Sequence, residues 1–326
     1  MNPRCPLCHS NSLRTLERIV VADLIALYQK KLRVDVTTEF SDQRELSLNE
    51  CAGCDLKFFL PLIAGSAEFY DLLQQHDWYY LREKSEYRFA SQQIGEQASV
   101  LDIGCGAGRF ADHLPGRQFT GLELSQAARE KAIARGLQVR SESVQAHAQQ
   151  QVGRYDVVSA FQVIEHVADI HSFIRAGLEC LKPGGLLIYS APSADSFVTE
   201  TSNGILNLPP HHLSWWSDRC LRRVAEIFGL QLVALEHEAL APVHFRWYGF
   251  NQALRMMARL TGYQGKLIDR SVKYKITAAL AAPLAALYWL RLRWTDALPR
   301  GHSVTAVYRQ VATADGHEFI FSTDEL

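Results

Sequence analysis

A short apolar run that leads directly into a glycine-rich turn constrains this chain more than any other feature. Residues 100–103 read Val-Leu-Asp-Ile and residues 104–108 read Gly-Cys-Gly-Ala-Gly, after which an amphipathic segment begins. Glycine lets the backbone turn tightly and approach a ligand with no side chain in between. The free N–H groups at the start of a following helix favour an anionic ligand group. The sequence therefore predicts a strand–loop–helix unit that binds a ligand where its strand ends.

Apolar runs alternate with amphipathic segments from Val100 onward, which is typical of an α/β sheet. The expected strands are Ser99–Ile103, Phe119–Leu122, Leu137–Val139, Tyr155–Ala160, Leu186–Ser190, Leu230–Leu235 and Ser303–Tyr308. The helices expected between them are Arg109–Leu114, Ser125–Arg135, Asp169–Cys180 and Asp218–Phe228. Because strand follows helix repeatedly, we expect a doubly wound, mostly parallel, Rossmann-like sheet of seven strands.

The spacing of the glycine-rich loop distinguishes it from two other nucleotide-binding loops. A dinucleotide fingerprint reads G-x-G-x-x-G and a P-loop ends in Gly-Lys-Ser/Thr. Here Asp102 begins an Asp-x-Gly-x-Gly-x-Gly pattern, and Gly108 is followed by Arg109-Phe110. The next expected strand ends at Glu123, and a carboxylate at that position can accept hydrogen bonds from both hydroxyls of a ribose. The loop and this carboxylate together predict a nucleoside site.

Four segments, in order along the chain, resemble the motifs of class I S-adenosylmethionine-dependent methyltransferases. They are Leu101–Gly108, Gly121–Ser125, Phe161–Val167 and Leu181–Gly185. The resemblance covers residues from about 96 to 310 and implies that S-adenosylmethionine is the cofactor. It implies that Glu123 holds the ribose and that Gln162 faces the methyl group. The loop residues that it places around the methionine part of the cofactor are Asp102, Gly104, Cys105, Gly106 and Gly108.

Four of the seven cysteines form two C-x-x-C pairs near the N-terminus. Cys5 is paired with Cys8, and Cys51 with Cys54. Two such turns can complete a tetrahedral four-thiolate zinc site with no open position, which makes the ion structural. A redox dithiol is the alternative. Between the pairs we expect a helix within residues 12–31 and a strand over residues 45–49.

The cysteine pairs and the aromatic segment that follows them resemble a group of bacterial methyltransferases with an N-terminal zinc-binding domain. The group includes sugar C-methyltransferases of deoxysugar pathways and enzymes of polysaccharide clusters. In such enzymes the aromatic segment closes over the cofactor, so the resemblance implies that Tyr79 and Tyr80 form a lid. The alternative is that these aromatic side chains only pack the two domains together.

Two histidine-containing segments could supply the base that methyl transfer to oxygen or carbon needs. Glu165-His166 follows the fourth expected strand, at the edge where open α/β sheets bind ligands. His211-His212 follows the fifth expected strand, between Pro-Pro and a Leu-Ser-Trp-Trp run. The sugar C-methyltransferases carry Tyr-His-Glu-His-Leu-Ser at this place, so the resemblance matches His212 to the last histidine and puts His211 in place of the glutamate. The Pro-Pro pair departs from that pattern. The alternative is that His166 and His212 only pack.

The expected organisation has four parts. They are a zinc-binding module over 1–60, a helical aromatic linker or lid over 61–95, the cofactor-binding domain over 96–312, and a tail over 313–326. A helical insertion of about 241–300 separates the last two strands. Residues 255–300 carry nine basic and two acidic side chains. Their apolar stretch Ile276–Leu290 suits a helical lid that covers the substrate pocket or a dimer partner, and the alternative is a helix lying at a membrane interface.

The near-zero net charge of the chain limits the kinds of binding partner that we expect. The chain has 34 basic and 35 acidic residues, so it has no global attraction for nucleic acid. The first twenty residues lack an apolar run, and we expect a cytoplasmic protein, with peripheral membrane contact through 273–294 as the alternative to a lid. The sequence predicts methyl transfer to a small-molecule or glycan acceptor, either a sugar nucleotide or a lipid-linked one. The alternatives are a natural-product or quinone-type O-methyltransferase and a non-catalytic scaffold.

Overall fold

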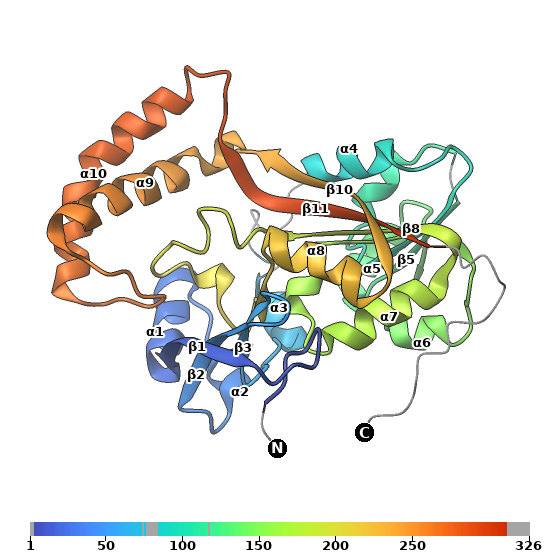
Figure 1. The fold of residues 1–326 in the computed structure, drawn as a ribbon, viewed down its shortest axis with the longest axis horizontal. Coiled ribbons are helices and arrows are strands. Elements are labelled where there is room, and N and C mark those ends of the chain that lie inside the picture. The colour runs from blue at the N-terminus through green and yellow to red at the C-terminus, as the bar shows by residue number, and fades with distance from the viewer. Residues whose placement is uncertain (1–2, 74, 76–83, 117, 312–326) are drawn as a thin grey trace.

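A seven-stranded sheet forms the centre of the computed structural model, which describes residues 3–73, 75, 84–116 and 118–311 (Figure 1). The strand order is β10-β11-β8-β7-β4-β5-β6, and β4 to β8 run parallel while β11 runs antiparallel to β8 and β10. The strands are β4 Ser99–Ile103, β5 Gln118–Leu122, β6 Gln138–Arg140, β7 Tyr155–Phe161, β8 Leu181–Pro192, β10 Leu230–Ala239 and β11 Arg300–Gln310. The predicted doubly wound, mostly parallel sheet is confirmed.

Helices cover both faces of this sheet, because its inner strands alternate between two apolar cores. In β8, Tyr189 packs with α7 and α8, whereas Ile188 packs with α4 on the other face. The flanking helices are α4 Ser85–Gln92, η1 Arg109–His113, α5 Gln126–Ile133, α6 Val144–Ala148, α7 Ile170–Cys180 and α8 Asp218–Ile227. The segment expected to be a helix after the glycine-rich loop is a short 3₁₀ helix, η1.

Side-chain caps fix where three of these helices begin. Ser125, Asp169 and Ser217 each accept a hydrogen bond from a backbone N–H in the first turn of α5, α7 and α8, respectively. Such caps satisfy donors that have no partner within the helix. The helix starts therefore follow from local sequence.

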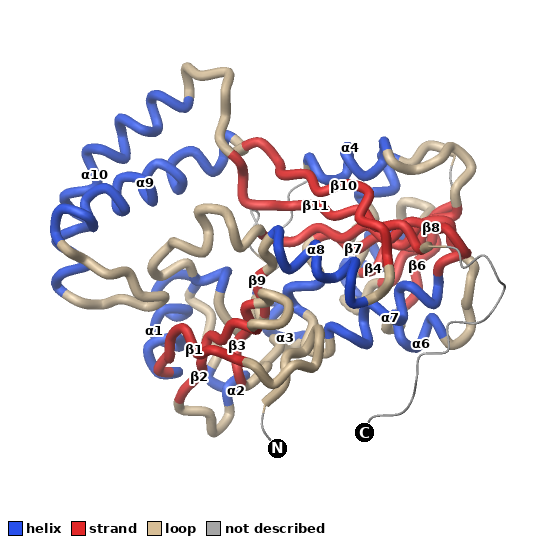
Figure 2. The backbone as a smooth tube through the Cα atoms, in the orientation of Figure 1, coloured by secondary structure: helices blue, strands red, loops and turns tan. Residues whose placement is uncertain are grey.

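The N-terminal residues form a second, antiparallel sheet in the order β1-β2-β3-β9 (Figure 2). Its elements are β1 Leu13–Val20, α1 Val21–Leu32, α2 Thr37–Phe40, β2 Glu45–Cys51, β3 Lys57–Leu60 and β9 Ser214–Trp215, and α3 Ala67–Leu73 follows β3. The helix expected within residues 12–31 is wrong in its first half, which is strand β1. Ion pairs from Arg14 to Glu50 and from Arg18 to Glu45 join β1 to β2, so pairing across the sheet decides this segment.

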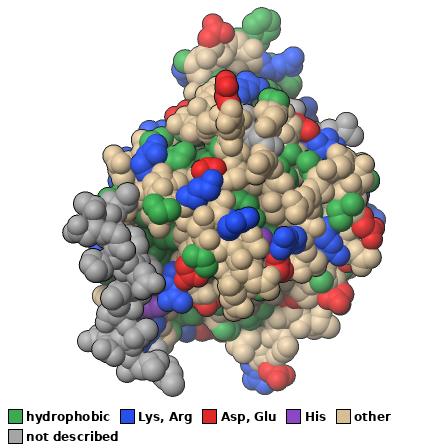
Figure 3. All heavy atoms as spheres, turned by 90° about the vertical axis from the view of Figure 1, so that its right-hand side faces the viewer, with side chains coloured by type: hydrophobic (Ala, Val, Ile, Leu, Met, Phe, Trp, Pro, Cys, Tyr) green, Lys and Arg blue, Asp and Glu red, His purple; other side chains and the backbone are tan. Residues whose placement is uncertain are grey.

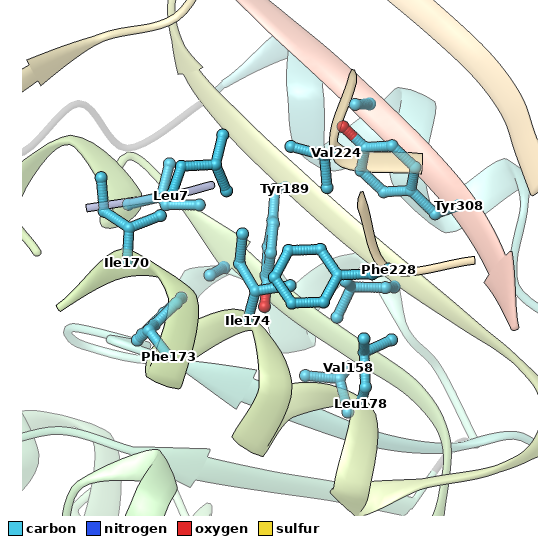
Figure 4. Close-up of a cluster of buried hydrophobic side chains, with 14 of the residues drawn as sticks. Leu7, Val158, Ile170, Phe173, Ile174, Leu178, Tyr189, Val224, Phe228 and Tyr308 are labelled. Atoms are coloured by element: carbon cyan, nitrogen blue, oxygen red, sulfur yellow. The ribbon is translucent and has the colours of Figure 1, made fainter. Parts of the chain in front are cut away.

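The fourth strand of this small sheet comes from far along the chain. Strand β9 lies in the connection after β8, and its Ser214 pairs with Phe58 of β3. The two parts also share one apolar core, which contains Leu7, Phe58, Trp216 and Cys220. Figure 4 shows Leu7 beside Ile170 of α7. The small sheet is therefore built partly from the main domain and packs directly on it.

The insertion between β10 and β11 is a helical hairpin that projects from the main sheet (Figure 1). It contains η4 Pro242–His244, α9 Phe245–Thr261 and α10 Val272–Leu292, and α9 packs along α10. The helical insertion predicted here is thus present. Within the described part of the chain, no helix is long and apolar enough to cross a bilayer.

The shared core predicts that the small sheet and the main domain unfold together. Phe58 is fully buried in that core, so Phe58→Ala should lower the free energy of unfolding by about 3–5 kcal/mol. Leu16→Ala, on a β1 side chain that is 39% exposed, is the control and should cost under about 0.5 kcal/mol. Urea unfolding followed by tryptophan fluorescence measures both. Two separate transitions, or equal effects of the two substitutions, would contradict the shared core.

Candidate functional site

The glycine-rich loop after β4 has the backbone geometry that its sequence predicts. Gly104, Gly106 and Gly108 have φ angles of 66°, 54° and 69°, a region that L side chains rarely adopt. A Cβ on Gly104 would lie 2.6 Å from a methyl carbon of Val163, and one on Gly108 would lie 2.2 Å from a methyl carbon of Leu137. All three positions therefore favour glycine for backbone conformation, and at Gly104 and Gly108 a Cβ would also force a neighbouring side chain to move.

The side chain of Glu123 is hydrogen-bonded to this loop. Its carboxylate accepts hydrogen bonds from the backbone N–H of Gly106 and of Ser125, both at 2.8 Å. The backbone N–H groups of Gly104 and Cys105 donate to the carbonyl oxygen of Leu122, at 2.8 and 3.1 Å. The loops after β4 and β5 therefore form one unit, with an acidic side chain half-buried between them.

Asp102 and Cys105 lie behind the loop. Asp102 is 3% exposed and accepts a hydrogen bond from the Ser159 hydroxyl of β7 at 2.8 Å, and burial raises the pKa of Asp102 to about 7. The Cys105 thiol is buried so closely against Gly121 that a Cβ there would lie 2.5 Å from the sulfur. Both residues position the loop from beneath, and whether either touches a ligand stays a prediction.

Gln162 follows β7 and belongs to a polar cluster. Its side-chain amide donates to the Ser303 hydroxyl at 3.1 Å, and its nitrogen also lies 3.3 Å from a Glu86 carboxylate oxygen and 3.4 Å from the Ser190 hydroxyl oxygen. Sequence reasoning missed Glu86, Ser190 and Ser303. A pocket adjoins this cluster, lined by Ser85, Glu86, Phe89, Glu236, His237, Glu238, Ala239, Ser303 and Thr305.

Three histidines that the sequence presents in two segments lie together at the same edge of the sheet. His166 ends η2 Ile164–His166 after β7, and His211 and His212 lie in the connection after β8. The ring centroid of His166 is 4.7 Å from that of His211 and 5.0 Å from that of His212, and those two rings stack at 4.4 Å. The hydroxyl of Tyr70 lies 3.2 Å from Nδ1 of His166.

The ring orientation of each histidine is set through Nδ1. Nδ1 of His166 lies 2.5 Å from the carbonyl oxygen of His211, and Nδ1 of His211 lies 2.8 Å from that of Leu206. Nδ1 of His212 lies 3.1 Å from the side-chain oxygen of Asn207. Since these oxygens only accept, each Nδ1 carries the proton and the ring lone pair is on Nε2.

Burial keeps this histidine cluster uncharged. It lowers the pKa of His166 to about 4 and that of His211 to about 3, and it lowers the pKa of His212 well below the usual value. Three neighbouring imidazoles therefore offer lone pairs at neutral pH without having to lose a proton.

Glu165 places a carboxyl group beside the cluster. Its side chain is 1% exposed, and neither oxygen has a hydrogen-bond partner among the described residues. Oε1 lies 3.8 Å from Nε2 of His166, and burial raises the pKa of Glu165 to about 8. A buried carboxyl group without a partner is costly, so its position calls for a functional explanation.

Backbone contacts with both sheets hold the histidine loop. Leu213 donates its N–H to the carbonyl oxygen of Glu165 at 2.7 Å and accepts from the N–H of Phe59 at 2.9 Å. The carbonyl oxygen of Pro210 accepts from the N–H of Gly65 at 2.9 Å. The two histidines therefore sit in a connection that is anchored on each side.

A second group, which sequence reasoning missed, lies nearby. Nδ1 of His302 lies 2.6 Å from a carboxylate oxygen of Glu238, and the rings of His302 and His244 are 4.5 Å apart. His302 lies in the first residues of β11, which runs antiparallel and so begins at the edge where the parallel strands end. This group could have been expected only by recognising that the last strand runs antiparallel, which brings its first residues to the edge of the sheet where the histidine cluster lies.

The four N-terminal cysteines converge as predicted. Sγ of Cys5 lies 3.5 Å from Sγ of Cys54, Sγ of Cys8 lies 3.5 Å from Sγ of Cys51, and all four sulfurs lie within 4.8 Å of one another. Zinc–sulfur bonds of about 2.3 Å place tetrahedral ligands about 3.8 Å apart, so the four thiols fit such an ion. The predicted lid residues Tyr79 and Tyr80 lie outside the described residues.

Comparison with known proteins matches about half of the chain to a described domain. Residues 74–235 match the family model described as "Methyltransferase domain". Curated relatives named "Ubiquinone biosynthesis O-methyltransferase" are 39% identical over 99 residues in Escherichia fergusonii and 41% identical over 100 residues in Serratia proteamaculans. Each alignment covers 28% of this chain and 41% or 42% of the relative, so the chain spans less than half the length of the relatives it matches.

Two solved structures show a more distant likeness. An S-adenosylmethionine-dependent methyltransferase from Archaeoglobus fulgidus is 14% identical, with a TM-score of 0.49, over 74% of this chain and 99% of that chain. A methyltransferase from Thermotoga maritima, described as a possible histamine N-methyltransferase, is 14% identical with a TM-score of 0.46 over 75% and 97%. Residues 74–235 therefore match a methyltransferase domain through the family model alone.

The loop geometry predicts that Glu123 contributes to nucleoside binding. Glu123→Ala should weaken binding of S-adenosylhomocysteine at least about tenfold, because hydrogen bonds to a charged group contribute about 1.5–3 kcal/mol each. Isothermal titration calorimetry measures the affinity. Glu130→Ala, on an exposed carboxylate of α5, is the control. Glu123→Gln keeps one acceptor oxygen and should lose less, whereas unchanged affinity in Glu123→Ala would exclude the ribose role.

Proposed function

We propose that this protein transfers the methyl group of S-adenosylmethionine to a small-molecule or glycan acceptor. One observation carries the proposal: the glycine-rich loop closed on Glu123 and the histidine cluster lie at the carboxyl edge of one sheet. Ligands of open α/β sheets bind at that edge. The match of residues 74–235 to a methyltransferase domain supports the same conclusion.

In the proposed mechanism the glycine-rich loop binds the cofactor and the histidine cluster contacts the acceptor. When bound, the cofactor supplies a methyl group already activated on a sulfonium. The glycine-rich loop Gly104–Gly108, which has little side-chain bulk, lets the cofactor approach the backbone, and the Glu123 carboxylate orients it, while Asp102 fixes the loop through Ser159. The histidine cluster faces the acceptor, and the lone pair of His212, supported by His166, His211 and Glu165, accepts the acceptor's proton.

The identity of the acceptor is the finer part of the proposal. Similarity to zinc-containing sugar methyltransferases supports a glycan, as a sugar nucleotide or a lipid-linked intermediate. The curated relatives' name favours a quinone-type O-methyltransferase as the second candidate, although each alignment covers 28% of the chain. On the face shown in Figure 3, basic and acidic side chains are interspersed, as suits a small acceptor better than nucleic acid.

The four-cysteine group is proposed to bind a structural Zn²⁺. Its sulfurs are mostly buried, and burial raises the pKa of Cys8 to about 11, so a cation is needed to hold the thiolates. Four protein ligands leave no position for a substrate. The ion would then stabilise the fold rather than take part in methyl transfer.

The outer face of α10 is proposed to contact an anionic bilayer surface. Its large apolar side chains, and that of Trp294 two residues past its end, are 45–88% exposed and share one face, opposite the face packed on α9: Val272, Ile276, Leu280, Leu287, Leu290 and Trp294. Exposed Lys273, Lys275, Arg291 and Arg293 flank this face. An apolar stripe with basic flanks suits the headgroup region of an anionic membrane, where a lipid-linked acceptor would be available.

Replacement of His212 should separate catalysis from cofactor binding. His212→Gln should lower methyl transfer about 10²-fold or more, the usual loss when a general base is removed, without changing the affinity for S-adenosylhomocysteine. The assay follows tritiated methyl groups into a protein-free extract of the source cells. His147→Gln, on a buried histidine bonded to Glu142 and Tyr155, is the control. Wild-type turnover in His212→Gln would reject the base role, and absence of transfer by the wild type would favour a scaffold.

The proposed bilayer contact predicts binding to lipid vesicles. The protein should co-sediment with phosphatidylglycerol vesicles, less so at high salt, because the basic flanks are screened. Leu287→Asp should abolish co-sedimentation. Val152→Asp, at a 68% exposed apolar side chain before β7, is the control and should not. Failure of the wild type to co-sediment would favour a lid or a dimer surface for α10.

A further inference from the structure

We infer that His166, His211 and His212 form a binding site for a divalent transition-metal ion, distinct from the four-cysteine group. One ligand atom from each of these three residues lies within 4.8 Å of the others. Bonds of about 2.0–2.1 Å to a tetrahedral metal place nitrogen ligands about 3.4 Å apart, so small ring movements complete the site. Three imidazoles form the protein part of several catalytic metal sites, in which a further position remains open.

The hydrogen bonds around the rings are those that metal-binding histidines use. A ligating histidine almost always donates its other ring N–H to a carbonyl or carboxylate oxygen, which fixes the ring and its tautomer. Each Nδ1 here lies within 3.1 Å of such an oxygen, from His211, Leu206 and Asn207 in turn. Packing alone does not require each of the three rings to be oriented by its own hydrogen bond to a separate oxygen.

A buried carboxyl group without a partner also points to a cation at the cluster. The Glu165 side chain is 1% exposed, and within the described residues its oxygens have no hydrogen-bond partner, although Oε1 lies 3.8 Å from Nε2 of His166. A divalent ion at the rings would give this carboxyl group an opposite charge to face when it is ionised.

The donor set selects the class of metal. Imidazole suits zinc, iron, copper, cobalt and nickel, whereas magnesium and calcium prefer oxygen ligands. The four-cysteine group has only sulfur donors, so the two sites differ in chemistry and can be distinguished spectroscopically. Their separation in the fold also allows each to be emptied by its own substitution.

The role of the ion rests on the proposed function, but its binding does not. With the ion bound, His212 would hold the metal instead of accepting the proton itself. An acceptor hydroxyl at the open position would become more acidic, and the Glu165 carboxylate, facing the cation, would take its proton. The resulting oxygen would attack the methyl carbon while the carbon–sulfur bond breaks and its electron pair stays on sulfur. The acceptor class is then a hydroxyl compound.

Cobalt titration tests the site. The wild type, with zinc in its cysteines, should bind one further equivalent of Co²⁺, with visible d–d bands and no thiolate-to-cobalt charge-transfer band. His212→Gln should lose this equivalent while keeping its zinc, and Glu165→Gln should weaken cobalt affinity about 10–100-fold. His147→Gln should behave as the wild type. Metal content by mass spectrometry confirms each equivalent.

Two results would overturn the inference. One is the absence of a cobalt equivalent beyond the cysteine site, which would leave the cluster as a hydrogen-bonding surface for the acceptor. The other is loss of cobalt in His302→Gln but not in His212→Gln, which would assign the ion to the Glu238–His244–His302 group. Cobalt binding without methyl transfer would refute the proposed function and leave the metal site standing.

Discussion

The pairing of β9 with β3 is the constraint on which the position of the histidine cluster depends. Only two residues, Ser214 and Trp215, join the small sheet, but Trp215 and the adjacent Trp216 are almost fully buried. Burial of two indole rings stabilises this short strand far more than its few hydrogen bonds do. Because His211 and His212 directly precede it, their position is fixed by a sheet that is mostly built from the first sixty residues.

Features with a local signal could be predicted from sequence. The glycine-rich loop, the seven strands of the main sheet and the capped helices α5, α7 and α8 all have turn, cap or periodicity signals of their own. The first half of residues 12–31 has no such local signal. It forms strand β1 only because of its contacts across the sheet, such as the Thr15–Asn49 hydrogen bond.

The histidine cluster and its neighbours could be predicted only in part. Both histidine segments were candidates, but they are 45 residues apart, and they meet because β7 and β8 are parallel neighbours whose ends lie side by side. Glu86, Ser303 and His302 carry no motif. They reach this edge through the packing of α4 and the reversed direction of β11, and both are properties of the whole sheet.

The position of the cysteine group would let a structural ion influence the histidine cluster without contacting it. Cys54 precedes Phe58 by four residues, and the backbone between them leads from the proposed ion-binding turn into the strand that pairs with Ser214. Cys51 ends β2, the other neighbour of that strand. An ion that locks these two turns would fix β3, and β3 pairs with β9, which follows the histidines in the chain. If the histidines serve methyl transfer as proposed, the metal content of the N-terminal module would be coupled to activity without any contact between ion and substrate.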